Sequence, residues 1–455
     1  MPSLISHVRE RPPDCRFSWT LLAVVMLLVV PRSSDSAAWA QVRVGVACEP
    51  AGVIPDTGGP IAEIVLHFTL EKASELEPAY YDLFNALPAD VSLQIICPSS
   101  ADAEGFLLRW GPEASAGGRQ VQVVNVNCPI TIWARDRRIA RQSAYSGKVV
   151  STFAPAGVPD YGEDKCGELL VTRLLASEGL IPGIVGSDLH IEGGNVVSNH
   201  RHAFIGANVF EENAATIPDP LCLHHELIGL TGRQYVVLSD EFDRVPWCHV
   251  DMYVTPVDES AVLVASPALA RRILLSDVLS ADADVCFGFE EEILRASSTA
   301  ESTLAAIAAQ LADGGYRVIR LPAVIDPKEE WMVTYNNVLM ERRNGQRVVY
   351  MPVYRIPTLD QAAAATYESL GFVVHIIDVS TIYEGGGAVR CLANVTARRP
   401  IDARVQPPVK GRLSTSCSDE GSANSEGLCR SAISARCTGG AACDPDEVED
   451  AVPRY

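Results

Sequence analysis

Five short polar stretches carry the residue types from which a reactive site could be built. They are "TIWARDRR" with Asp136, "HIEGGN" with Glu192, "CHVDMY" with His249 and Asp251, "YNNVLM" with Asn336 and Asn337, and "VRCLAN" with Cys391. A cysteine thiolate is a strong nucleophile, and a nearby histidine can hold a proton for a leaving group and then activate water. Carboxylates such as Asp136 and Asp251 would bind a planar fork of N–H donors. Together, these groups suit a guanidinium.

The five stretches recur at nearly regular intervals. Their separations, measured from Asp136, Glu192, His249, Asn336 and Cys391 in turn, are 56, 57, 87 and 55 residues. The long interval fits one extra segment of about thirty residues, inserted between Pro267 and Ser298. A fixed period of this size predicts an array of supersecondary units that each present a loop at the same place. Five units around an axis would bring all five stretches to one central site.

The residues between these stretches predict an α/β protein. Eight runs of four to eight residues, rich in Val, Ile and Leu, are typical of strands. They are "AEIVLHF", "VSLQIIC", "VQVVNV", "YVVLS", "AVLVAS", "YRVIRLP", "RVVYMPVY" and "FVVHIIDV". Helix-like stretches such as "ESTLAAIAAQLADGG" and "LDQAAAATYESLG" separate several of them, and each closes on glycine, as helices often do.

Four of the motifs, in this order, resemble those of a known enzyme family. W-A-R-D, E-G-G-N, the H-x-D of His249-Val250-Asp251 and a glycine-rich run ending in Cys391 are similar to the motifs of agmatine deiminases and bacterial peptidylarginine deiminases. These belong to the guanidino-group-modifying superfamily. The likeness covers roughly residues 60 to 400. It implies the pentein fold, a five-bladed α/β propeller of ββαβ repeats.

The resemblance also implies a reaction and a role for each residue. Cys391 would attack the guanidinium carbon, ammonia would leave, and water would release a ureido product. His249 matches the general acid/base, Glu192 the acid that orients it, and Asp136 and Asp251 the carboxylates that hold the substrate. No metal or organic cofactor is implied. The expected substrate is a small cationic guanidino compound such as agmatine, or an arginine-containing peptide.

Two other functions remain open from the sequence. An amidinotransferase of the same superfamily would pass the amidino group to an amine instead of water, and a non-catalytic binding descendant would keep the fold without the chemistry. Two departures from the family bear on this choice. Arg390 stands where the family usually has the histidine before its nucleophile, and Asp136 is followed by Arg137-Arg138-Ile139 instead of T-G-P or Y-G-P.

Each residue also has a plain structural interpretation. Cys391 could be a buried thiol or half of a disulfide, His249 a core histidine, Asp136 the partner of a neighbouring arginine, and Glu192 a turn residue. Asn336 and Asn337 could line the pocket or only hydrogen-bond a turn. Trp133 could form an apolar wall for the substrate or pack in the core. The histidines of "NHRH" and "LHHE" lack a matched ligand spacing, so surface positions are expected for them and no metal site.

The ends of the chain differ in composition from its body. Three arginines precede the apolar run 17–30, and A-W-A follows at 38–40, which predicts a signal peptide over residues 1–40 and a secreted or periplasmic protein. A catalytic domain is expected at 41–405. The Ser-, Gly- and Cys-rich acidic stretch 406–455 is expected to be a tail, flexible or held by its own four cysteines.

The net charge excludes some partners and favours others. The formal charge is −20, whereas binding to nucleic acid or to an anionic membrane normally takes a basic patch. We therefore expect no nucleic acid partner, and no membrane association after signal cleavage. An acidic surface would attract a cationic substrate, although it could equally serve only solubility. The sequence does not predict the oligomeric state or the disulfide pairing.

Overall fold

The computed structural model describes most of the central part of the chain. The described residues are 51–136, 138–143, 146–154, 163–240, 244–246, 248–278, 291–326 and 331–400. The predicted signal peptide, the predicted tail and Arg137 lie outside them, so those expectations stay predictions. Among the described residues, no helix is both long enough and apolar enough to span a membrane.

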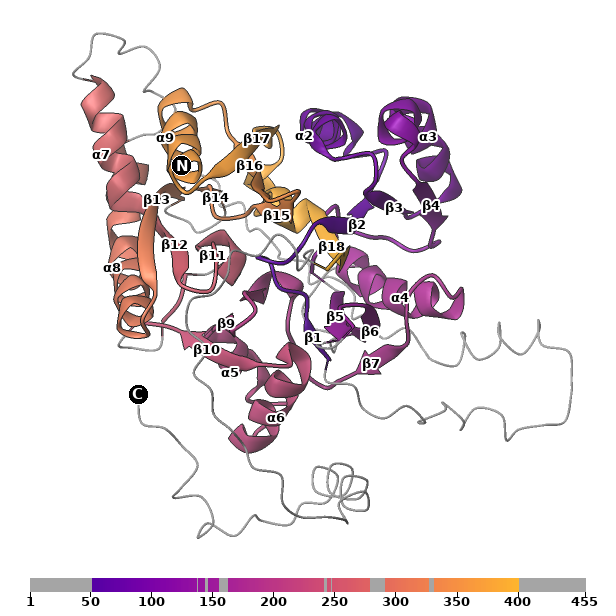
Figure 1. Cartoon of the computed structure of the whole chain (residues 1–455), viewed down its shortest axis with the longest axis horizontal. Coiled ribbons are helices and arrows are strands. Elements are labelled where there is room, and N and C mark those ends of the chain that lie inside the picture. The colour runs from indigo at the N-terminus through magenta and orange to yellow at the C-terminus, as the bar shows by residue number, and fades with distance from the viewer. Residues whose placement is uncertain are drawn as a thin grey trace, which may run out of the picture. The chain divides into compact units, whose positions relative to one another are not determined.

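Within the described residues the strands form five separate sheets, and the expected α/β class is confirmed (Figure 1). In hydrogen-bonded order, one sheet contains β18 (Ala393–Arg398), β2 (Ile61–His67), β3 (Ser92–Cys97) and β4 (Val121–Asn125), and a second contains β1 (Ala51–Val53), β5 (Ile139–Ser143), β6 (Val149–Ala154) and β7 (Ile184–Gly186). A third contains β10 (Gln234–Leu238), β9 (His202–Gly206) and β8 (Val196–Ser198), and a fourth contains β11 (Val254–Pro256), β12 (Ala261–Ser266), β13 (Arg317–Ile325) and β14 (Met332–Thr334). The fifth contains β15 (Leu339–Arg343), β16 (Gln346–Val353) and β17 (Phe372–Asp378).

One strand pattern recurs in all five sheets. Two neighbouring strands pair antiparallel, and a third pairs parallel with the second, as in β5–β6–β7, β8–β9–β10, β11–β12–β13, β15–β16–β17 and β18–β2–β3. A parallel pair needs a crossover, which is usually helical. Here the crossovers contain α2 (Ala73–Ala86), α4 (Glu163–Ser177), α5 (Asn208–Asn213) with α6 (Pro220–Thr231), α7 (Pro267–Val278) with α8 (Glu291–Asp313), and α9 (Pro357–Ser369).

The crossover between β12 and β13 explains the long interval in the sequence spacing. It holds two helices of 12 and 23 residues, α7 and α8, where the crossover in the sheet of β15 to β17 holds only the 13 residues of α9. The extra helix lies in the region where the spacing placed an inserted segment. A further helix, α3 (Ser100–Ala114), links β3 to β4.

Local sequence signals explain where several elements begin and end. In α6 the side chain of Asp219 accepts a hydrogen bond from the Leu221 N–H, Pro220 begins the helix, and Gly232 ends it with a φ of 64°. Every residue of β12 is buried, which accounts for its apolar sequence up to Ser266.

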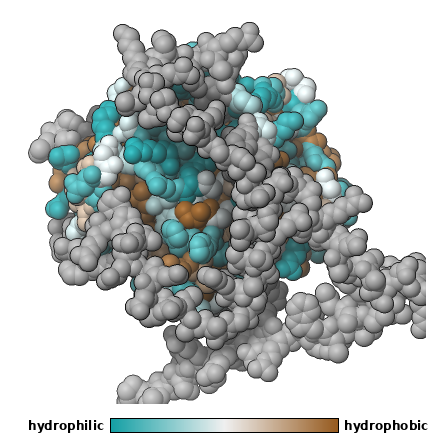
Figure 2. All heavy atoms as spheres, turned by 60° about the horizontal axis from the view of Figure 1, so that its bottom comes forward, coloured by the Kyte–Doolittle hydropathy of each residue, from teal (hydrophilic) through white to brown (hydrophobic). Residues whose placement is uncertain are grey.

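The last described strand completes the first described sheet. β18 pairs antiparallel with β2, with Ala393 opposite Leu66, although about 330 residues separate them. Side chains on both strands belong to the largest apolar cluster, which also includes residues of α2, α3, α9 and β16. The coloured residues on the face in Figure 2 are mostly hydrophilic, with small apolar groups between them.

Candidate active site

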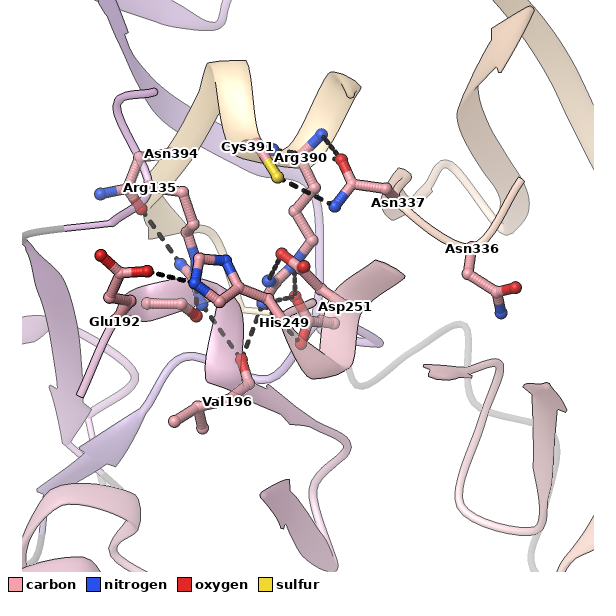
Figure 3. A network of polar contacts seen from close by, with 12 residues as sticks. Arg135, Glu192, Val196, His249, Asp251, Asn336, Asn337, Arg390, Cys391 and Asn394 are labelled. Carbon is pink, nitrogen blue, oxygen red and sulfur yellow. Dashed lines mark hydrogen bonds and ion pairs between the residues drawn. The ribbon is translucent and has the colours of Figure 1, made fainter. Parts of the chain in front are cut away.

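Each of the five polar stretches lies directly before the strand that opens the shared three-strand pattern in a different sheet. Asp136 precedes β5, Glu192 precedes β8, His249 and Asp251 precede β11, Asn336 and Asn337 precede β15, and Cys391 precedes β18. Short helical turns carry several of them, namely η3 (Gly193–Asn195), η4 (Val250–Met252) and α10 (Val389–Leu392). Each polar stretch therefore has the same place relative to its sheet, and Figure 3 shows residues from these stretches together.

The thiol of Cys391 is free and buried. It forms no disulfide, and only 3% of the residue is exposed. The Nδ2 group of Asn337 donates a hydrogen bond of 3.2 Å to its Sγ atom. Burial is the largest cause that raises the pKa of the thiol above its usual value, and the charge of Asp251 adds to it. The interaction with the ring of His249 lowers the pKa but does not outweigh them.

His249 lies between two carboxylates. Its Nε2 atom forms a short contact with Oε2 of Glu192, and its Nδ1 atom is 4.0 Å from Oδ1 of Asp136. Burial lowers the pKa of the imidazole, but Glu192, the hydrogen bond with Cys391 and Asp136 outweigh that effect, so the pKa lies well above the usual value. His249 is therefore held as a cation near neutral pH. The expected pairing of Glu192 with His249 is present.

Arg390 is directed onto two carboxylates. Its Nη1 donates to Oδ2 of Asp251 at 2.7 Å, and its Nε and Nη2 donate to Oδ1 of Asp56 at 3.1 and 3.0 Å. Asp251 is fully buried, and its other oxygen, Oδ1, accepts no hydrogen bond from the described residues. Burial raises the pKa of Asp251, while Arg390 and His249 lower it, and the net shift is upward. One oxygen of Asp251 thus remains for a further donor.

Buried Arg135, from the W-A-R-D motif, forms hydrogen bonds with residues of two other polar stretches. Its Nε donates to the Gly193 carbonyl at 3.1 Å and its Nη1 to Oδ1 of Asn394 at 3.1 Å, while its backbone N–H donates to the Cys391 carbonyl at 3.2 Å. The Gly193 N–H in turn donates to the Asp136 carbonyl at 2.9 Å. Backbone positions from three different units are fixed together in this way.

The glycines of two motifs permit close packing beside the site. A Cβ atom on Gly194 would lie 2.4 Å from Nδ1 of His249, and one on Gly387 would lie 2.7 to 2.9 Å from the ring of Trp133. Trp133, which is partly buried, packs against apolar residues of two core clusters and against this glycine run. The glycines before Cys391 therefore allow the chain to pass close to the ring of Trp133.

The two adjacent asparagines have different surroundings. Asn337 is fully buried and contacts Cys391, whereas Asn336 points away from the thiol (Figure 3). The Nδ2 of Asn336 donates to Oγ1 of Thr255 at 3.1 Å and to the Leu263 carbonyl at 3.2 Å. The Asn336 amide thus satisfies buried polar groups of β11 and β12, which fits the structural one of its two possible roles.

Three residues of this region were not predicted from the sequence. Asp56 follows β1 and pairs with Arg390, Asn394 holds Arg135, and Glu212 of α5 lies close enough to Glu192 and His249 for their charges to affect its pKa. Partial desolvation comes first among the causes that raise the pKa of Glu212. None lies in one of the five stretches quoted above except Asn394, which ends "VRCLAN".

The site also offers a set of atoms that could hold a metal ion. One ligand atom each from Asp136, Glu192 and His249 lies within 4.8 Å of the others. Metal binding would require the imidazole to lose its proton, and the raised pKa of His249 opposes that loss. The sequence implied metal-independent chemistry, in which these three residues bind a proton and a cationic substrate.

Comparisons with known proteins identify the fold. No protein-family model and no curated protein matches the chain. Among solved structures, an agmatine deiminase from C. jejuni with substrate bound is 15% identical, with a TM-score of 0.54 over 77% of this chain and 97% of that chain. The agmatine deiminase of Enterococcus faecalis is 13% identical, with a TM-score of 0.56 over 78% and 99%. The chain shares the α/β fold of these enzymes, and the resemblance seen in the motifs is confirmed at that level.

Proposed function

We propose that this protein is a cysteine hydrolase, a deiminase that converts a guanidino group to a ureido group and releases ammonia. The observation that carries the proposal is the contact of the Cys391 thiol with His249, which is itself paired with Glu192 and faces Asp136. The named activity of proteins with the same fold supports it.

The proposed architecture is the five-bladed propeller. Five sheets with one shared strand pattern, and the pairing of β18 with β2, support this arrangement. In such a propeller the loops before β5, β8, β11, β15 and β18 would face a common axis. The contacts of Arg135, Asn337 and Arg390 between different units are those that the arrangement requires.

In the first half-reaction, substrate binding releases the Cys391 thiol proton to solvent, and the thiolate attacks the guanidinium carbon and forms a C–S bond. His249, cationic before the attack, donates its proton to the departing nitrogen, and the C–N bond breaks to release ammonia. The product is a cationic thiouronium on Cys391, and His249 is left neutral. The positive charge of the incoming substrate offsets the negative charges of Asp136 and Asp251, which raise the pKa of the thiol, so substrate binding favours the thiolate.

In the second half-reaction, neutral His249 takes a proton from water, and the resulting hydroxide adds to the thiouronium carbon. The C–S bond then breaks and the electron pair returns to Cys391 as thiolate. As the ureido carbonyl forms, the hydroxyl proton passes to solvent, where the released ammonia takes it up as ammonium. Glu192 stabilises the imidazolium that is regenerated. Overall, a guanidinium and water give a ureido group and ammonium.

The hydrogen bonds around Cys391 favour a cationic substrate over an acyl substrate. Acyl transfer needs free N–H donors for a developing oxyanion. Here the Cys391 N–H already donates to Oδ1 of Asn337 at 3.2 Å, and Asp136 and Asp251 lie beside the thiol. Carboxylates at this place stabilise a guanidinium and would repel an oxyanion.

The proposed substrate is small and carries a second cation, as agmatine does. Glu212 is exposed, lies near Glu192 and His249, and is available for a distal ammonium group. The matched neighbours named as agmatine deiminases support the same choice. Arginine in peptides is the alternative substrate, and the test below distinguishes it from agmatine.

The test measures ammonia and ureido product with agmatine, free arginine and an arginine peptide, using the wild type and Cys391→Ala. We expect turnover of agmatine by the wild type and none by the variant. Unchanged turnover in Cys391→Ala would refute the mechanism. Amidino transfer to an added amine, with no ureido product, would identify an amidinotransferase.

A separate measurement addresses the non-catalytic alternative. A haloacetamidine reagent mimics the guanidinium and alkylates a nucleophilic thiol, so the native protein should be modified at Cys391. Protein that is folded but unmodified at Cys391, and inactive on all three substrates, would be a binding descendant.

A further inference from the structure

The amide of Asn337 makes three contacts with one short segment, Arg390-Cys391. Its Oδ1 accepts hydrogen bonds from the Arg390 N–H at 2.8 Å and from the Cys391 N–H at 3.2 Å, and its Nδ2 donates to Sγ of Cys391 at 3.2 Å. Asn337 is fully buried, and it precedes β15, whereas Cys391 precedes β18 in another sheet. One side chain therefore fixes both the backbone and the sulfur of the neighbouring unit (Figure 3).

The orientation of this amide follows from the groups around it. Two backbone N–H donors face one end, and only an acceptor can satisfy them, so the carbonyl oxygen must lie there. The NH2 end is then directed at the sulfur. A flipped amide would set its NH2 group against the two backbone N–H donors and lose both of those hydrogen bonds.

The sulfur lies among groups that disfavour its charged form. Burial, Asp251 and Asp136 all act against a thiolate, and His249 acts in its favour. His249 must also give its proton to the leaving group in the proposed reaction, after which it no longer donates to the sulfur. A neutral donor that never titrates would support the thiolate throughout the cycle.

We propose that Asn337 is a catalytic residue that donates its Nδ2–H to the Cys391 thiolate and aims the sulfur for attack, as well as capping the turn that carries it. From the sequence, Asn337 could line the pocket or only hydrogen-bond a turn. The inference rests on Cys391 being the reacting thiol, which is part of the proposed function, but it makes a claim that can be tested without any deiminase substrate.

The experiment compares the pH dependence of Cys391 alkylation by iodoacetamide in the wild type and three variants. Modification is followed on the Cys391 peptide by mass spectrometry, so other cysteines do not interfere. Asn337→Ala removes the donor and the cap together. Asn337→Asp keeps an oxygen for the two backbone N–H groups but replaces the donor by an acceptor, which separates the two roles.

Asn336→Ala is the matched control. It removes the adjacent asparagine, which is equally buried but donates to Thr255 and Leu263. Loss of stability is expected in that variant, without a change at the thiol. Thermal unfolding of all four proteins shows whether each is folded under the labelling conditions.

We expect the midpoint of the alkylation profile to rise by about one pH unit in Asn337→Ala, with about tenfold slower alkylation near neutral pH. The rise should be larger in Asn337→Asp, and absent in Asn336→Ala. Folded Asn337→Asp with the wild-type profile would overturn the proposal, as would equal shifts in Asn337→Ala and Asn336→Ala.

The two proposals fail in different ways. If the wild type does not turn over a guanidino substrate but Asn337 variants shift the alkylation profile, the proposed function fails and the link between Asn337 and the thiol stands. If deiminase activity is found and the profile does not depend on Asn337, only the present inference is lost.

Discussion

Arg390 occupies the position next to Cys391 where the related motifs have histidine, and a cation there could oppose a cationic substrate. The side chain instead spans Asp251 and Asp56, both within hydrogen-bonding distance, and is 4% exposed. Its charge is thus compensated by two carboxylates. In the proposed reaction, Asp251 keeps Oδ1 for a substrate N–H.

Stability tests this account of Arg390. Removing one partner of a buried ion pair leaves an uncompensated charge, and we expect Arg390→Ala to lower the free energy of unfolding by about 3 kcal/mol. Urea unfolding followed by circular dichroism gives the measurement. Arg320→Ala is the control, because Arg320 pairs with Glu301 at 2.8 Å but is partly exposed, and it should cost below about 1 kcal/mol. Equal losses would contradict the prediction.

Glu192 should set the alkaline limit of activity. After the opposing effect of burial, its charge is the first cause that raises the pKa of His249, so the proton is present near neutral pH and is lost as the pH rises through that raised pKa. Glu192→Gln removes the charge and lowers the pKa. The alkaline limb of kcat/KM for agmatine should therefore move to lower pH.

The pH profile of kcat/KM, measured for the wild type, Glu192→Gln and Glu301→Gln, checks this expectation. Glu301 pairs with Arg320 away from the thiol, and its variant should keep the wild-type limb. Because His249 and Cys391 interact, the pKa values read from the two limbs of the profile belong to the pair and not to either residue alone. An unmoved alkaline limb in Glu192→Gln would mean that Glu192 does not control the proton on His249.

At the scale of elements, the site depends on turns that pack without room for side chains. The turn η3 follows Glu192 and brings Gly194 against His249 in the turn before η4. A methyl group there would lie 2.9 Å or less from three atoms of His249, including its Cβ, so a ring rotation alone does not relieve the clash. The pairing of His249 with Glu192 would be lost.

We expect Gly194→Ala to reduce kcat/KM for agmatine by about 100-fold, because a shift of about 1 Å in a catalytic group has that order of effect. Gly183→Ala is the matched control, since its Cβ would meet nothing within 4 Å. Steady-state kinetics at one pH are sufficient. Wild-type activity in folded Gly194→Ala would show that the contact with His249 is not needed.

The eight strands expected from apolar runs are all present, as β2, β3, β4, β10, β12, β13, β16 and β17. The sequence could predict them because each contains a run rich in Val, Ile or Leu, although β4, β10 and β17 are only partly buried. Strands such as β5, with sequence IARQS, and β8, with only three residues, lack that signal and owe their conformation to pairing with neighbours. The spacing of the polar stretches indicated where the sheets of these strands lie in the sequence, whereas hydropathy did not.

At the scale of the whole molecule, the sequence predicted that the five polar stretches converge, but it did not predict which residues pair with them. Glu192, His249 and Cys391 could be named because each lies in a short motif that is recognisable on its own. The pairs of Asp56 with Arg390 and of Asn337 with Cys391 join residues more than fifty positions apart. Asp56 stands in a turn without any motif, so only the fold reveals it.

The net charge of −20 leads to a last prediction, which belongs to the molecule as a whole. If the acidic surface attracts a cationic substrate, kcat/KM for agmatine should fall several-fold as salt rises from low to physiological ionic strength, because salt screens interactions over distances above about 8 Å. Alkylation of Cys391 by neutral iodoacetamide, measured at the same salt concentrations, controls for changes within the site and should stay constant. A parallel loss in both rates would locate the salt effect at the thiol, and a constant kcat/KM would leave solubility as the role of the charge.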